Sequence, residues 1–175
     1  PLTYKISEIK CIAVRHLKNI ISGIRFSSSK SSDKLPVLIY KHGSLIRRRL
    51  GNVDSRLQDN KAVNLTLSAP KISGLLIRPG ETFSFWRLVG KPTVRKGYKE
   101  GLLISDGQMS SGIGGGMCQF TNLLHWMVQH TPLTITEHHH HDGMDLFPDY
   151  DRQIPLDRKS DVDGKSVDLG GRRMI

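Results

Sequence analysis

The 175-residue chain has few cysteines, few aromatic residues and no long apolar run, and each shortage excludes a class of protein. Two cysteines, Cys11 and Cys118, cannot build the disulfide framework of a small secreted domain, and they fit a reducing compartment. No basic segment followed by an apolar core and a cleavage site opens the chain, so no signal peptide is predicted. The sequence begins with Pro1 instead of methionine, which leaves open what precedes it.

A stretch without any charge runs from residue 107 to residue 136, yet it does not have the composition of a membrane span. Polar residues and a proline interrupt it, namely Gln119, Asn122, His125, Gln129 and Pro132. We therefore expect protein core and a site there, and a location in the cytoplasm or on the cytoplasmic face of the membrane.

Acidic residues are scarce in the first part of the chain. Residues 1–50 hold eleven Lys and Arg against two acids, whereas residues 136–175 hold six against nine, and the net charge is +10. A basic surface of this kind suits an anionic membrane, a wall polymer or nucleic acid, or is simply solvated. Nucleic acid ranks last, because the chain has no aromatic-basic RNA motif, zinc finger or recognition helix.

The spacing of apolar residues in segment 1–26 predicts a basic amphipathic helix that lies on an acidic membrane surface through residues 5–25, or packs on the domain. The apolar positions are Ile6, Ile9, Ala13, Leu17, Ile20 and Ile24. Composition then predicts a polar linker at 27–34, a domain at 35–154 and an atypical polar tail at 155–175.

Within the domain, hydrophobic patterns and turn residues predict an alternation of strands and helices. The expected elements are strands at 35–40 and 44–50, a helix from an Asp59 cap to about Ala69, an antiparallel pair from 74–77 and 81–86, and a hairpin joining 101–105 to 108–110 through Asp106-Gly107. This order predicts an α+β fold in a single domain, with antiparallel strands and a glycine-rich loop leading into a helix that begins at Cys118.

Three consecutive glycines, Gly114, Gly115 and Gly116, stand just before Cys118. A helix N-terminus lowers a thiol pKa, so Cys118 is a candidate nucleophile, and the backbone amides around Gly115 to Cys118 are candidates for holding an oxyanion. On a helical wheel Asn122, His125 and Gln129 share the face of Cys118, while Phe120, Leu123, Leu124 and Met127 lie opposite. The alternative is a small buried thiol at a packed glycine turn. Neither a P-loop nor a Gly-x-Ser-x-Gly elbow is present.

Four histidines follow at 138–141, after an alternation of Leu133, Ile135 and Glu137 that predicts a strand. His139 and His141 share one face of such a strand, and His138 and His140 the other. Either pair is a candidate general base for Cys118. Histidine pairs and a cysteine are also ligands that zinc prefers, which leaves a metal site open. A purification tag and a merely exposed polar loop are the remaining interpretations, and four internal histidines before an ordered-looking segment argue against the tag.

Together these residues resemble the VanW family, bacterial proteins named after a member of vancomycin-resistance gene clusters. The matching pieces are PGETFSFW (79–86), VGKPT (89–93), GYKEGLLISDG (97–107), IGGGMCQFTN (113–122) and TITEHHHHDGMDLFPD (134–149). The resemblance implies association with the cell envelope and with glycopeptide resistance, without naming a reaction. After RQIP the chain departs from the family pattern, as a truncated or frameshifted end would.

The family's glycine-cysteine motif falls on Gly114, Gly115, Gly116, Cys118 and Gln119, and its Glu-x-His-x-His motif on Glu137, His139 and His141.

Three functions follow as hypotheses. The first is cysteine-dependent acyl transfer or amide hydrolysis on a cell-wall-type peptide, with Cys118 as nucleophile, His139 or His141 as base, and Glu137 or Gln119 as a positioning group. In this hypothesis Asn122 and the three glycines face the substrate. The second is a module that binds a wall precursor or a glycopeptide without turnover. The third is a zinc site formed by Cys118, His139 and His141.

Overall fold

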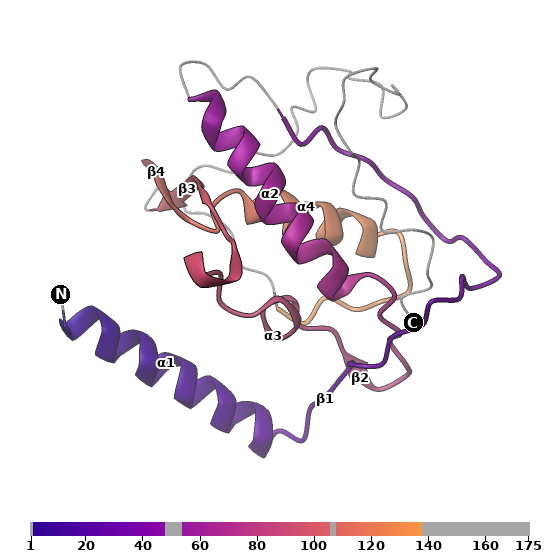
Figure 1. Cartoon of the computed structure of the whole chain (residues 1–175). Coiled ribbons are helices and arrows are strands. Elements are labelled where there is room, and N and C mark those ends of the chain that lie inside the picture. Colours follow the sequence, from indigo (N-terminus) through magenta and orange to yellow (C-terminus); the bar gives the residue numbers. More distant parts are fainter. Residues whose placement is uncertain (1, 48–53, 106–107, 138–175) are drawn as a thin grey trace.

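The computed structural model describes residues 2–47, 54–105 and 108–137 of the chain. The helices in these ranges are α1 (Leu2–Ile21), α2 (Ser55–Ile72), α3 (Phe85–Val89), the 3-10 turn η1 (Val94–Lys96) and α4 (Met117–Val128) (Figure 1). The strands are β1 (Arg25–Phe26), β2 (Glu81–Thr82), β3 (Glu100–Ser105) and β4 (Gln108–Ile113). The predicted mixture of helices and small sheets, an α+β architecture, is confirmed.

The long helix α2 begins earlier than the sequence pattern indicated. Its N-cap is Asp54, whose side chain accepts a hydrogen bond from the Arg56 amide at 2.8 Å. Asp59, which we expected to cap this helix, lies one turn inside it and pairs with Arg47 at 2.6 Å. The capping assignment was therefore wrong, because two aspartates five residues apart both satisfy the local pattern.

Strands β3 and β4 form the predicted antiparallel hairpin. Their register pairs Glu100 with Ile113 at one end and Ser105 with Gln108 at the other. The two turn residues, Asp106 and Gly107, lie outside the described residues. The hairpin was predictable because its two strands are neighbours in the sequence.

The second predicted pair, 74–77 with 81–86, was wrong. Strand β2 pairs in parallel with β1, matching Arg25 with Glu81 and Phe26 with Thr82, and Phe85–Val89 is helical instead of extended. Leu75 forms a bridge with Lys30. Residues 27–31, expected as a linker, thus run beside 74–82, and Ser27 is buried there.

Two further segments that we expected to be strands are not. Residues 35–40 and 44–47 form no strand, the chain bends at residues 36, 46 and 47, and Val37 and Leu38 are each 55% exposed. Residues 133–137 likewise form no strand. An alternating or apolar pattern becomes a strand only beside a partner, and none pairs with these segments within the described ranges.

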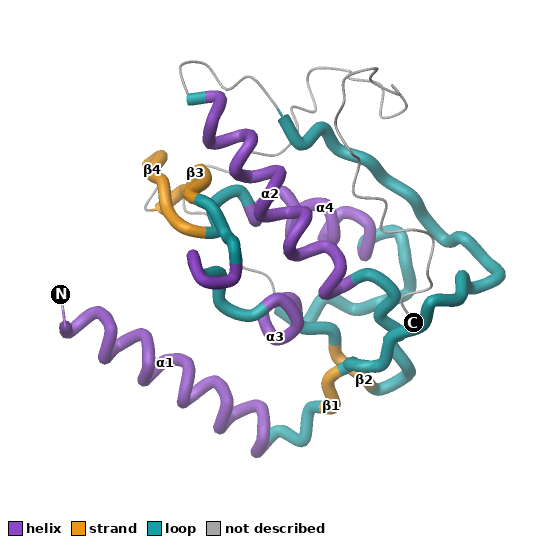
Figure 2. The backbone as a smooth tube through the Cα atoms, in the orientation of Figure 1, coloured by secondary structure: helices purple, strands orange, loops and turns teal. Residues whose placement is uncertain are grey.

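The hydrophobic core lies where α2, α3 and α4 meet (Figure 2). Phe120, Leu124 and Met127 of α4 are buried, as the helical wheel predicted. Partly buried aromatic rings surround them, among them Phe85, which meets Phe120 edge to face. The buried core consists of Leu65, Ile72, Val89, Met117, Phe120, Leu124 and Met127.

Helix α1 lies outside the group formed by α2, α3 and α4 (Figure 1). Its described side chains are exposed apart from Asn19, which is half-buried. Among the described ranges, no helix has both the length and the apolar character that a bilayer crossing needs.

Candidate functional site

The glycine turn joins the end of β4 to the start of α4. Gly114 and Gly116 have φ values of 81° and 85°, a left-handed conformation that residues with a Cβ rarely adopt. The Gly115 amide donates to the Gly112 carbonyl at 3.0 Å, and the Gly116 amide donates to the Leu102 carbonyl at 2.7 Å. These two amides, which we expected to face an oxyanion, are thus engaged with the hairpin.

Close packing explains why glycine stands in this turn. A Cβ placed on Gly101 of β3 would lie 2.5 Å from the Gly115 carbonyl oxygen, and one placed on Gly115 would overlap the Gly101 backbone. A Cβ on Gly114 would overlap Pro92, and one on Gly116 would overlap the Lys61 side chain. The turn is pressed against β3 and α2, which fixes the starting point of α4.

Asn64 of α2 holds the turn and the hairpin together. Its side chain is fully buried, donates to the Gly115 carbonyl at 2.9 Å and to the Lys99 carbonyl at 3.0 Å, and accepts from the Lys99 amide at 2.8 Å. One fully buried side chain therefore satisfies three backbone groups from two segments, of which the Gly115 carbonyl is buried and the two groups of Lys99 are part-buried. The apolar pattern of the sequence gave no sign of this residue, because its partners lie 35 and 51 positions away.

A second buried polar cluster lies one turn further along α2. The Ser68 hydroxyl donates to the Asn64 carbonyl at 2.8 Å and lies 3.0 Å from the Tyr98 hydroxyl. Lys71 donates to the Tyr98 hydroxyl at 3.1 Å and to the Val89 carbonyl at 2.9 Å. Tyr98 is 1% exposed, so this cluster fixes the chain just before β3.

Cys118 occupies the first turn of α4 and is half-buried. Burial raises the pKa of the thiol above its ordinary value, although the amides of Gln119 and Cys118 and the charge of Lys61 act in the opposite direction. The pKa reduction that we expected from the helix N-terminus is therefore outweighed by loss of solvent. At neutral pH the resting thiol is protonated.

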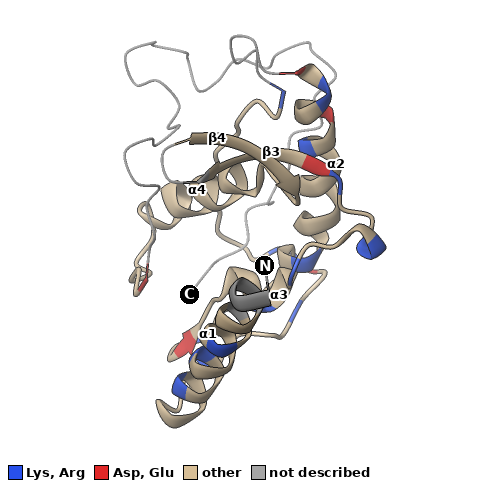
Figure 3. Cartoon of the chain, turned by 90° about the vertical axis from the view of Figure 1, so that its left-hand side faces the viewer, with Lys and Arg blue, Asp and Glu red and all other residues tan. Residues whose placement is uncertain are grey.

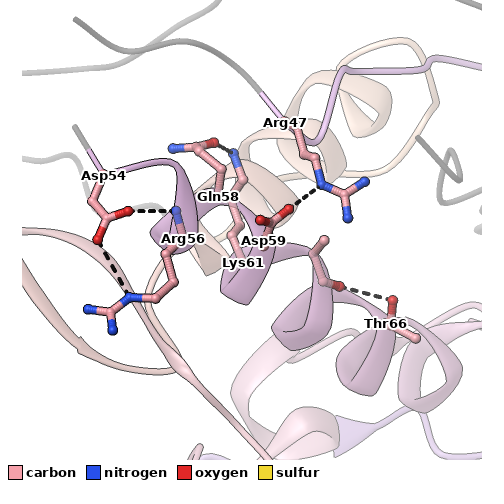
Figure 4. A network of polar contacts seen from close by, with 8 residues as sticks. Arg47, Asp54, Arg56, Gln58, Asp59, Lys61 and Thr66 are labelled. Atoms are coloured by element: carbon pink, nitrogen blue, oxygen red, sulfur yellow. Dashed lines mark hydrogen bonds and ion pairs between the residues drawn. The ribbon is translucent and has the colours of Figure 1, made fainter. Parts of the chain in front are cut away.

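Lys61 reaches this region from α2. It is 6% exposed, and its Nζ donates to the Gln58 Oε1 at 2.6 Å. Figure 4 shows this pair beside the ion pairs that Asp54 and Asp59 make with Arg56 and Arg47. A buried ammonium near a thiol favours the thiolate if that thiol loses its proton.

Gln119 anchors the segment before α2 to the start of α4. Its Nε2 donates to the Leu45 carbonyl at 2.6 Å and to the Ser44 hydroxyl at 3.1 Å. A small pocket of about 20 Å³ opens beside it, which is room for one water molecule and not for a peptide. Ser44, Ile46, Leu65, Gln119, Phe120 and Leu123 line this pocket.

The polar face of α4 continues beyond Cys118. Asn122 and His125 are half-buried and Gln129 is exposed, and the His125 and Gln129 side chains lie 3.0 Å apart at their Nε2 atoms. Of the four residues that the wheel placed opposite this face, Phe120, Leu124 and Met127 are buried and Leu123 is half-buried.

The histidine motif lies mostly beyond the described part of the chain. Glu137 is described and pairs with Arg15 of α1. His139 and His141, our candidates for a general base and for zinc ligands, lie outside the described residues, as do the tail and the boundary at 154. Within the described ranges no three His, Cys, Asp or Glu side chains gather as a metal site would require.

The fold and the site define a class of α+β proteins in which a packed glycine turn opens a cysteine-bearing helix. The chain belongs to the VanW family: a family model described as VanW like protein matches residues 60–172. The resemblance found in the sequence is confirmed.

Two curated relatives were found. The chain is 41% identical over 119 residues to the vancomycin B-type resistance protein VanW of Enterococcus faecalis (strain ATCC 700802 / V583), covering 68% of this chain and 43% of the relative. It is 39% identical over 82 residues to the uncharacterized protein YoaR of Bacillus subtilis (strain 168), covering 47% of this chain and 27% of that relative. The matched part thus spans less than half of either relative's length. No solved structure shows a significant match.

Proposed function

We propose that this chain acts in glycopeptide resistance at the cell envelope by cysteine-dependent acyl transfer or amide hydrolysis on a cell-wall-type peptide. The observation that carries the proposal is the environment of Cys118: its sulfur lies at the start of α4, next to the amides of Cys118 and Gln119 and near Lys61. These groups favour the thiolate, whereas burial favours the thiol.

The opposing effects of burial and of the nearby amides and Lys61 on the pKa of the Cys118 thiol define the mechanism that we propose. The resting thiol holds its proton, so attack on the peptide carbonyl requires a base, and His139 or His141 fills that role in the proposal. The sulfur forms a thioester with the acyl group, and the leaving amine takes the proton from the base. Water or an acceptor amine then releases the acyl group and restores the thiol.

The other candidate residues have more limited roles in this scheme. Because the amides of Gly115 and Gly116 bond to the hairpin, we assign the developing oxyanion to the first amides of α4. Gln119 holds residues 44–45 against the site, and Asn122 lies one helical turn from Cys118, where a substrate would pass. Glu137, paired with Arg15, positions the segment that leads to the histidines.

Turnover of wall-type peptides by two cysteine variants tests the proposal. Cys118→Ser should lower the rate by at least about a thousandfold, because a serine hydroxyl at that position lacks the nucleophilicity of the thiol. Cys11→Ser is the matched control, since Cys11 lies exposed on α1, and it should keep the full rate. Equal turnover by Cys118→Ser and Cys11→Ser contradicts the proposal.

The burial of Cys118 favours a second candidate, a module that binds a wall precursor or the glycopeptide without turnover. A buried neutral thiol packs well against a fixed turn and needs no base. Calorimetric titration of Cys118→Ala separates the two: a binding module keeps its Kd in this variant, and the parent protein then shows no turnover. Zinc held by Cys118, His139 and His141 would instead appear as about one zinc per chain in elemental analysis.

A further inference from the structure

Helix α1 presents an uncovered apolar stripe to the solvent. At about 100° per residue, five of its side chains fall within an arc of about 80°. Four of these are large and exposed: Ile6 by 57%, Ile9 by 66%, Leu17 by 57% and Ile20 by 76%. The fifth, Ala13, is also exposed. A row of this length, along a helix of 20 residues, needs a partner surface.

Polar and basic side chains border the stripe. Lys10 lies at one edge and the His16 ring at the other, and Arg15 and Lys18 lie on the opposite side of the helix. The helix carries four Lys and Arg against one acid, and the basic excess continues through residue 50. Figure 3 shows Lys and Arg positions spaced along α1. Arg15 pairs with Glu137, and this contact leaves the apolar stripe open.

We propose that α1 lies in the interface of a membrane rich in acidic phospholipids, with the stripe of Ile6, Ile9, Ala13, Leu17 and Ile20 inserted, Lys10 against the headgroups and the remaining basic charge of the helix drawn toward the acidic surface. An amphipathic helix with this distribution binds through buried apolar area and attraction to anionic lipid together. A second copy of the chain fits the stripe less well, because pairing two stripes would place the Lys10 charge of each helix at the edge of the contact. The inference is independent of the chemistry at Cys118.

Co-sedimentation of the whole chain with phosphatidylglycerol-rich vesicles tests this placement, with phosphatidylcholine vesicles in parallel. We expect binding to the acidic vesicles that falls at least about tenfold on neutral vesicles or at high salt. Ile9→Glu places a charge in the stripe and should lower binding at least about tenfold. The matched control is Ser7→Glu, which adds the same charge on the polar face and should lower binding by less than about threefold.

Three outcomes would overturn the proposal. Equal loss of binding in Ile9→Glu and Ser7→Glu would mean that vesicle binding depends on the charge of the helix alone and that the stripe does not insert. Equal binding to neutral and acidic vesicles would remove the role of the cations. A dimer in sedimentation equilibrium that Ile9→Glu dissociates, without vesicle binding by the parent, would assign the stripe to a second copy. Far-UV circular dichroism checks that both variants keep the helix.

Discussion

At the scale of single residues, Asn64 connects the elements of the site most directly. It satisfies three backbone groups at a position with no solvent access. Nothing in the local sequence marks it, because an asparagine in a helix normally indicates an exposed surface. The candidate site therefore depends on a residue whose role becomes visible only in the folded chain.

Asn64→Ala should lower the free energy of unfolding by roughly 2 to 4 kcal/mol, since it removes three hydrogen bonds and takes the side-chain partner from the buried Gly115 carbonyl and the part-buried Lys99 amide. Urea denaturation measures the loss. The control is Asn60→Ala, one turn earlier in α2, which removes a single exposed bond to the Glu100 carbonyl and should cost under about 1 kcal/mol. Equal costs for the two variants would show that the buried bonds contribute little.

The thiol of Cys118 should react slowly at neutral pH. In a Cys11→Ser background, iodoacetamide alkylation should accelerate only above the ordinary thiol pKa of about 8.5, because burial raises the pKa of Cys118. The native state holds this proton more tightly than the unfolded chain does. The free energy of unfolding should therefore decrease as the pH rises above the ordinary value, and less steeply after Cys118→Ser. A reaction rate that has already reached its plateau below neutral pH would contradict this.

At the scale of elements, the contact between the glycine turn and β3 is backbone against backbone, so no side chain can move to make room. Gly115→Ala should cost at least about 2 kcal/mol and lower the melting temperature by several degrees. Gly43→Ala is the control, since a Cβ there meets nothing within 4 Å, and it should change stability by less than about 0.5 kcal/mol. An unchanged melting temperature in Gly115→Ala would show that the turn tolerates displacement.

A cluster of rings joins the segment before α2 to the end of α4. Tyr40 stacks on His130 with centroids 3.9 Å apart, Trp126 donates to the Tyr40 hydroxyl at 3.1 Å, and His42 lies 6.2 Å from the Trp126 ring. Burial lowers the pKa of His42, and the charge of nearby His130 lowers it further. The cluster is therefore built around a neutral His42.

Mild acid should loosen this cluster. The stability that neutral His42 contributes is present above the ordinary histidine pKa and is lost as the pH falls through the lowered pKa. Fluorescence of Trp126, in a Trp86→Phe background, should report the change. His42→Phe keeps a ring without a titrating group, so its transition should be weaker than that of the parent. Identical acid transitions in both proteins would exclude His42 as the cause.

Elements whose partners are near in sequence could be predicted, and the others could not. The hairpin β3–β4 is local, and α4 begins at Met117, one residue before the predicted start. Segment 35–40 has an apolar strand pattern but contacts α4 through Tyr40 instead of pairing. Helix α2 buries Asn64 and Ser68, which an apolar periodicity does not reveal. The pKa of Cys118 depended on burial, a tertiary property.

At the scale of the whole molecule, three features that are far apart in the sequence serve the reaction that we propose at Cys118. The glycine turn and α2 fix the thiol, the segment through Glu137 leads toward the histidines, and α1 offers a surface for acidic lipid. The matched part of the chain spans less than half of either relative's length.

Intact-mass analysis of the chain, after incubation with a peptide ester that resembles a cell-wall stem peptide, tests whether Cys118 forms an acyl-enzyme. We expect a mass increase equal to the acyl group, mapped by digestion to Cys118 and absent from Cys118→Ala. Saturable peptide binding without any adduct or turnover, equal in the parent and in Cys118→Ala, would contradict the claim and favour the binding module.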